Sequence, residues 1–202
     1  MLGLALVTAV RPPRRLSKEA RREQLVAAAM PVVAEQGLGE FSLDEIASAA
    51  DVTRNLLYHY FPRGREDVAL AVVEQACREL TADWVVDERL PLSDRLTVNF
   101  AQMMDQALVP SVAWRVYRRA RAAGQPEIDE IVAQYTESVI SSISRNHLGR
   151  SKPPALVHVA LTGFVAFAEA VLDEARITKA PRKRVMKLLS DTLVATIQAA
   201  FG

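Results

Sequence analysis

Residues 41–62 have the sequence FSLDEIASAADVTRNLLYHYFP, in which apolar side chains recur at helical spacing on both sides of a short break. Ser42 followed by Glu45 is a capping-box pattern, which predicts the start of one short helix. Thr53 is a favourable N-cap for a second helix, and Pro62 ends it because proline disfavours the helical conformation in the preceding residue. Two short helices joined by a tight turn are typical of the helix-turn-helix motif.

The second of these helices is expected to keep one face free for binding. With about 100° of rotation per residue, the face turned toward the other helices carries Leu57, Phe61, Tyr60 and Thr53. The outward arc carries Asn55, Tyr58, His59 and an oddly placed Leu56. An amide can pair with adenine, phenol and imidazole groups can bind phosphates, and an apolar side chain can contact a thymine methyl. This arc therefore suits the major groove of DNA.

Positive charge gathers around this motif, although the whole chain carries a net charge of only +1. Arg54, Arg63 and Arg65 flank the second helix, and residues 11–22 hold an excess of five positive charges. The basic residues of that segment are Arg11, Arg14, Arg15, Lys18, Arg21 and Arg22. Charge concentrated at one end of a neutral chain is typical of nucleic-acid binding. The alternative interpretation is a helical hairpin that packs its aromatic side chains in a core, beside a solvated basic tail.

The rest of the chain predicts an all-α fold. Half of the residues are hydrophobic, which is enough for a substantial core, and apolar side chains repeat at helical period almost throughout. A first helix is expected from the N-cap Ser17 to Gln36, just before Gly37. Beyond the motif we expect six longer helices, at 65–88, 93–108, 111–123, 126–148, 154–177 and 181–200.

The sequence offers no support for catalysis. The three histidines, His59, His147 and His158, fall on different predicted helices, and no zinc-protease, phosphate-loop or dinucleotide-binding motif is present. Cys77 is the only cysteine, which excludes an intrachain disulfide and a multi-cysteine zinc site. We therefore expect no enzyme, no cofactor and no bound metal.

The chain is also expected to be cytoplasmic and to have no membrane contact. Its first ten residues are apolar, but a bilayer takes about 20 residues to cross, and the positively charged start of a signal peptide is missing. No later stretch is expected to span a membrane. A single cysteine fits a reducing compartment.

Residues 17 to about 80 resemble the DNA-binding domain of TetR-family transcriptional regulators. In that family a short helix and a turn ending in Val-Ser/Thr precede a recognition helix that closes in Leu-Tyr-x-x-Phe. The matching positions here are Val52, Thr53, Leu57, Tyr58 and Phe61. The resemblance implies a tail at 1–16, expected to be disordered, a helix-turn-helix domain at 17–64, and a ligand-binding and dimerisation domain of about six helices at 65–202.

The same resemblance assigns DNA contacts by position. The groove and phosphate contacts would come from Thr53, Arg54, Tyr58, His59 and Tyr60, and Ser42 and Leu43 would lie at the DNA backbone. Asn55 stands where the family usually has Gly or Pro, and Leu56 where it usually has a polar residue, so both are candidate groove contacts of unknown base preference. One extra residue follows Pro62, and we assign the family's phosphate-binding basic residue to Arg65, with Arg63 as a competitor.

The middle of the larger domain is rich in large, adaptable side chains, which fit a cavity for an apolar or aromatic effector. The candidates for its walls are Trp84, Phe100, Met103, Met104, Trp114, Tyr117, Tyr135 and Phe164. Polar anchors would come from Tyr117, Tyr135, Gln102, Asn99 or Ser138. The alternative is that all of these are ordinary core residues. The basic run Arg115, Arg118, Arg119 and Arg121 is interpreted as a solvated face, with an anionic-ligand site as the other reading.

Family members bind DNA as two-fold dimers through their last two long helices, and here the corresponding helices have broad apolar faces. Those faces carry Leu156, Val159, Gly163, Phe164, Phe167, Val185, Leu188 and Leu189, among others. A homodimer predicts a palindromic operator with half-sites separated by about one helical turn of DNA (about 34–36 Å) or a multiple of it. The alternative is that both faces are used within one subunit.

The sequence therefore predicts a TetR-like DNA-binding regulator, a repressor that binds double-stranded operator DNA as a dimer and is released by a small, largely apolar effector. The alternative is a dimeric helical sensor without sequence-specific DNA binding, which the unusual Asn55 and Leu56 leave open.

Overall fold

The computed structural model describes residues 16–201, except 83 and 85–88. The described residues form helices only, which confirms the all-α prediction. The helices are α1 (Lys18–Gln36), α2 (Leu43–Ala49), α3 (Arg54–Tyr60), α4 (Arg65–Thr81), α5 (Leu92–Leu108), α6 (Val112–Arg121), α7 (Pro126–Leu148), α8 (Ala155–Thr178) and α9 (Arg182–Phe201).

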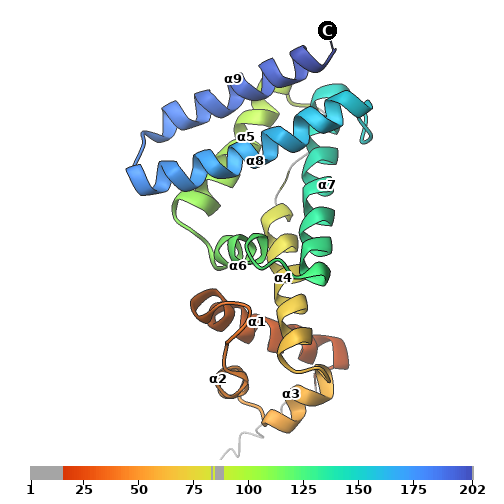
Figure 1. Cartoon of the computed structure of the whole chain (residues 1–202), viewed down its shortest axis with the longest axis vertical. Helices are drawn as coiled ribbons and strands as arrows, with labels where there is room; N and C mark the ends of the chain where they lie inside the picture. Colours follow the sequence, from red (N-terminus) through yellow and green to blue (C-terminus); the bar gives the residue numbers. More distant parts are fainter. Residues whose placement is uncertain (1–15, 83, 85–88, 202) are drawn as a thin grey trace, which may run out of the picture.

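The helices form a small group at one end of the molecule and a larger group at the other. Helices α1, α2 and α3 lie together, and α4 runs from them toward the larger group (Figure 1). Helix α6 packs against both α1 and α4, and α8 and α9 lie side by side at the far end (Figure 1). Contacts between the two groups therefore involve α1, α4 and α6.

Most predicted helix boundaries lie within a few residues of the observed ones, with one larger difference. The helix expected over 65–88 ends at Thr81, and residues 83 and 85–88 lie outside the described part of the chain. The tail expected at 1–16 is described only at Leu16, so Arg11, Arg14 and Arg15 have no described position.

The helix-turn-helix core consists of the side chains that the helical period placed inward. Leu57 of α3 is fully buried, Phe61 nearly so, and Ile46 of α2 is completely inaccessible. Thr53 and Ser17 act as N-caps, as predicted: their side chains accept hydrogen bonds from the backbone amides of Leu56 and Ala20, respectively. These caps satisfy amides that have no partner inside a helix.

The capping box at α2 differs from its prediction. Ser42 Oγ accepts the Glu45 amide at 3.2 Å, but Glu45 does not reach back to the Ser42 amide. The Ser42 N–H donates instead to Gln36 Oε1 at 2.8 Å, and Gln36 Nε2 donates to Glu45 Oε2 at 2.6 Å. Gln36 is the last residue of α1, so its amide group joins the end of α1 to the start of α2.

Helix α8 corrects the expectation that no stretch is apolar enough to span a membrane. Its 24 residues are long and apolar enough by length and composition. This is weak evidence for a span, because the core helix of a soluble protein passes the same test. In the structure α8 packs against α5, α7 and α9, and its buried side chains, such as Val157, Leu161 and Leu172, follow helical spacing.

The bridging role of Gln36 predicts a measurable loss of stability. Gln36→Ala removes two hydrogen bonds between helices and should lower the free energy of unfolding by about 1–2 kcal/mol. Gln75→Ala is the matched control, because Gln75 bonds only within α4, where such pairs contribute about 0.2–0.5 kcal/mol each. Urea unfolding of both variants makes the comparison, and equal losses would contradict the bridging role.

Candidate functional site

Helix α3 presents a free face, largely as the helical period predicts. Asn55, His59 and Tyr58 are exposed, with 39% of Tyr58 accessible, while Leu57 on the opposite side is buried. Asn55 and His59 make no side-chain hydrogen bonds to other described residues, and His59 has an edge contact with the Tyr60 ring. An amide, an imidazole and a phenol are therefore available on one surface.

Five other predicted contact positions differ from a simple free face. Thr53 is exposed rather than turned toward the core, because it is the N-cap and lies outside the helix. Leu56 and Tyr60 are half-buried, so only part of each is accessible. Leu43 is buried, so its side chain is not accessible, and its position at the DNA backbone stays a prediction. Ser42 is half-buried and uses its hydroxyl to cap α2.

Arg54 joins the two helices of the motif. Its NH1 nitrogen donates to both carboxylate oxygens of Asp44 at 3.0 and 2.8 Å, and its guanidinium lies over the Tyr58 ring, 5.7 Å from the ring centre. Hydrogen bonding to Tyr58 and the charge of Asp44 raise the pKa of Arg54. Arg54 therefore remains charged at the edge of the free face.

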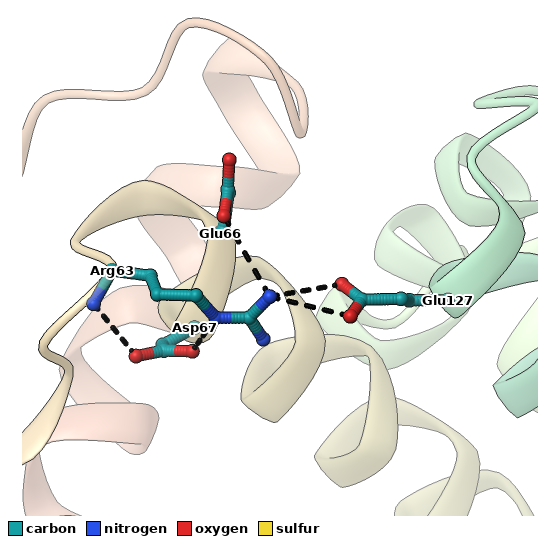
Figure 2. Close-up of polar contacts among 4 residues, drawn as sticks. All are labelled: Arg63, Glu66, Asp67 and Glu127. Carbon is teal, nitrogen blue, oxygen red and sulfur yellow. Dashed lines mark hydrogen bonds and ion pairs between the residues drawn. The ribbon is translucent and has the colours of Figure 1, made fainter.

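Arg63, one of the two candidates for the phosphate-binding position, is surrounded by carboxylates. Its Nε donates to Asp67 Oδ1 at 2.7 Å, and its backbone N–H donates to Asp67 Oδ2 at 2.9 Å. Its NH1 lies 3.2 Å from Glu127 and 3.7 Å from Glu66 (Figure 2). Glu127 belongs to α7, so Arg63 connects the turn after α3 to the larger group of helices.

The charges around Arg63 also affect Asp67. Burial alone would raise the pKa of this carboxyl group, but hydrogen bonds from Arg63 outweigh burial and hold the pKa below its ordinary value. Arg63 is therefore engaged with acidic groups.

Arg65 is exposed, and its Nε donates to the Phe41 carbonyl at 2.9 Å, next to the start of α2. The turn before it depends on Gly64, whose φ of +63° favours glycine. A Cβ at Gly64 would also lie 3.1 Å from Tyr58 Cε1. The glycine thus allows α4 to begin directly beneath the tyrosine of the free face.

The larger group of helices encloses a cavity of about 60 Å³. Its walls come from α5, α6, α7, α8 and α9, together with Trp84 after α4. Six of the eight predicted wall residues line it, namely Trp84, Phe100, Met103, Trp114, Tyr135 and Phe164. Met104 and Tyr117 do not line it, because both are fully buried in the packing around it, which corrects their prediction.

The polar groups of this cavity were only partly predicted. Asn99 and Tyr135 line it, whereas Tyr117, Gln102 and Ser138 do not. Sequence reasoning missed three polar residues in the wall, Ser142, Asn146 and Glu169. Glu169 could have been found, because it is a lone acidic residue within the apolar run 164–172 of a long helix. Ser142 and Asn146 give no comparable signal.

Glu169 is a buried carboxylate with three partners on α6. Its Oε1 accepts a hydrogen bond from the Tyr117 hydroxyl at 2.5 Å, and its Oε2 lies 3.3 Å from both Arg118 and Arg121. Arg118 also pairs with Asp173, one turn further along α8. Burial, followed by the negative charge of Glu169, raises the pKa of Tyr117, so its hydroxyl stays protonated and donates.

The other two arginines of α6 bind the end of α1. Arg115 donates to Glu35 Oε1 at 2.6 Å, and this hydrogen bond lowers the pKa of Glu35. Arg119 donates to the carbonyls of Ala34 and Glu35 at 3.0 and 2.9 Å. A cation near a helix C-terminus is stabilising, because the unpaired carbonyls there carry a partial negative charge.

The expectation of a solvated basic face on α6 is therefore wrong. We call the two sets of contacts made by α6, with Glu169 on one side and the end of α1 on the other, the α6 bridge. One helix connects the cavity wall directly to α1, which packs against α2 of the helix-turn-helix motif.

The outer side of α8 and α9 exposes several large apolar side chains. Leu156 and Val159 of α8 are 63% and 66% exposed, and Leu188 of α9 is 48% exposed. Other residues of the predicted dimer faces, including Phe164, Val185 and Leu189, are buried within the subunit. Each of these helices therefore has one apolar face inside the subunit and further apolar residues on its surface.

Within the part of the chain that the structure describes, no group of three or more His, Cys, Asp or Glu side chains could hold a metal ion. His158 lies 2.9 Å from Glu137, and burial lowers the pKa of His147. Burial raises the pKa of the Cys77 thiol to about 12, so it is not a ready nucleophile.

Residues 25–72 match the family model described as "Bacterial regulatory proteins, tetR family". No curated protein matches the chain. The matched segment contains α2, α3 and most of α1, so it coincides with the motif read from the sequence.

Several solved structures have a similar fold. A tetR-family transcriptional regulator from Streptomyces coelicolor is 24% identical, with a TM-score of 0.77 over 92% of this chain and 83% of that one. Salmonella enterica GusR is 18% identical, with a TM-score of 0.65 over 88% of this chain and 98% of its own. The multidrug binding protein EbrR, solved with proflavin, is 19% identical, with a TM-score of 0.58 over 85% and 99% of the two chains. At these identities the likeness concerns the fold.

The α6 bridge predicts different outcomes for two tyrosine substitutions. Tyr117→Phe removes a donor from a buried carboxylate and should lower the free energy of unfolding by about 1–3 kcal/mol. Tyr58→Phe removes a hydroxyl that only accepts a 3.4 Å contact on the surface, and should change it by less than about 0.5 kcal/mol. Chemical denaturation measures both changes. If Tyr117→Phe leaves the free energy of unfolding unchanged, Glu169 does not need this donor.

Proposed function

We propose that this chain, whose N-terminal domain and fold are those of the TetR family of bacterial regulators, is a dimeric transcriptional repressor. It binds a palindromic operator and is released by a small, largely apolar effector. The observation that carries this proposal is the free face of α3, where Asn55, Tyr58 and His59 are exposed beside Arg54.

In this proposal α3 enters the major groove. Asn55 and His59 reach base edges or phosphates, since neither is held by another described side chain. Arg65 binds phosphate in preference to Arg63, because three carboxylates already surround Arg63. The domain boundaries follow from this division: 17–64 contacts DNA, and 65–202 binds the effector and the second subunit.

The α6 bridge supports a route from effector to DNA. A ligand that displaces Glu169 changes the contacts of Arg118 and Arg121, and the same helix holds the end of α1 through Arg119. Gln36 passes that displacement to α2. A difference of about 1–3 kcal/mol in ligand affinity between the two forms gives a 5–150-fold change in operator affinity.

The exposed apolar residues of α8 and α9 support a homodimer through these two helices. Large exposed apolar patches mark interaction sites, and a two-fold interface brings the same patch of both subunits together. We further propose that the protein acts in the cytoplasm, has no membrane contact and carries out no catalysis.

Specific DNA binding is tested on a duplex selected from a random pool by the unmodified protein. Replacing Asn55 and His59 together by Ala should weaken binding to that duplex at least about tenfold, because each good base contact contributes about 1–3 kcal/mol. Gln134→Ala, an exposed amide on α7, is the control and should bind normally. Thermal unfolding of the double variant should be unchanged, since both side chains are exposed.

The alternative function gives the opposite result. If no duplex is enriched, or if the selected and scrambled duplexes bind equally at every salt concentration, the chain is a sensor without sequence-specific DNA binding.

The dimer is tested by placing charges on its proposed interface. Val159→Glu combined with Leu188→Glu should give a monomer in sedimentation equilibrium, because the two carboxylates would be buried without partners. Val109→Glu is the control, since Val109 is 80% exposed in the loop between α5 and α6. A double variant that stays dimeric would place the interface elsewhere.

A further inference from the structure

We propose that the cavity selects a neutral molecule about the size of one aromatic ring, carrying a single hydrogen-bonding group that pairs with the amide of Asn146. Naming this molecule as the effector rests on the proposed function, whereas its chemistry follows from the cavity wall alone.

Asn146 provides the anchor. It lies on α7, lines the cavity and is only 6% exposed, and its Oδ1 has no hydrogen-bond partner among the residues that the structure describes. Buried polar groups in proteins are nearly always paired, so a buried amide without a partner at a cavity points to a group supplied from outside. Ser142, one turn earlier on the same helix, lines the same side of the cavity and is 5% exposed.

The charge balance of the wall favours a neutral ligand. Among the described residues that line the cavity, Glu169 is the only one with a carboxylate, and Arg118 and Arg121 already compensate its charge. A cationic ligand would have to compete with both arginines and with the Tyr117 hydroxyl. An anionic ligand would be placed against the Glu169 carboxylate, in a wall that is otherwise mostly apolar.

The size and shape of the cavity indicate one ring. The cavity volume of about 60 Å³ is well below the about 150 Å³ of an apolar cavity that holds benzene, so one ring, admitted with some movement of the wall side chains, is the upper limit of size and a fused ring system is too large. Phe100 and Phe164 contact each other edge to face, 6.3 Å apart, and Trp114 adds a further aromatic surface. Such rings pack well against another aromatic ring.

Binding can be followed directly, because the only two tryptophans of the chain, Trp84 and Trp114, both line the cavity. The probes are four single-ring molecules: toluene, para-cresol, benzoate and benzylammonium. At pH 7 they are apolar, neutral with a hydroxyl, anionic and cationic, respectively. Titrating each into the full-length protein should show that para-cresol binds about five- to tenfold tighter than toluene. The two ions should bind more weakly than toluene.

A substitution identifies the anchor. Asn146→Leu keeps a similar shape and removes the amide, so the preference for para-cresol over toluene should disappear while toluene binding remains. Ser138→Ala is the control: Ser138 lies two turns away on the same helix, outside this cavity, and bonds to the Gln134 carbonyl. Circular dichroism checks that both variants fold, and the unmodified protein tests the proposal by itself if the Leu variant does not.

Several results would overturn the proposal. Equal binding of toluene and para-cresol would remove the amide as an anchor, and tightest binding of benzylammonium would make Glu169 the anchor and the ligand a cation. If none of the four probes changes the tryptophan fluorescence, the cavity does not bind such a molecule. Operator binding is measured on the same samples without probes, so a failure of DNA recognition is seen separately from a failure of the cavity chemistry.

Discussion

The buried charge of Glu169 is the constraint around which the larger group of helices is arranged. A carboxylate inside an apolar wall is unfavourable unless it is paired and hydrogen-bonded. Tyr117, Arg118 and Arg121 meet that need from one side of α6. With that side fixed against α8, Arg115 and Arg119 face the end of α1. The position of the DNA-binding motif relative to the cavity thus depends on how one acidic side chain is neutralised.

The helix-turn-helix end follows the opposite principle, because two of the α3 side chains that we propose as DNA contacts are not hydrogen-bonded to other described residues. Asn55 and His59 extend from a seven-residue helix that owes its position to Leu57 and to the Thr53 cap. A helix this short has little stability of its own, so packing against α2 and the neighbouring core holds it in place. Gly64 then lets the chain turn beside Tyr58 without a clash.

Which features could be predicted from the sequence depends on how far apart the interacting residues are along the chain. The caps at Ser17, Ser42 and Thr53 and the inward position of Leu57 are local patterns, and the structure confirms them. The partners of the α6 arginines lie between 48 and 85 residues away in the chain, so spacing alone suggested solvated side chains. The anchor Asn146 was missed for the same reason, because nothing in its neighbourhood in the sequence indicates a cavity wall.

The last three residues of α1 differ from an ordinary helix end, because they contact two other helical segments. Ala34 and Glu35 receive the arginines of α6, and Gln36 holds the start of α2, so two junctions share a single turn of helix. Substitutions in that turn would therefore alter how α1 joins both α6 and α2, without changing the exposed residues of α3 or the residues that line the cavity.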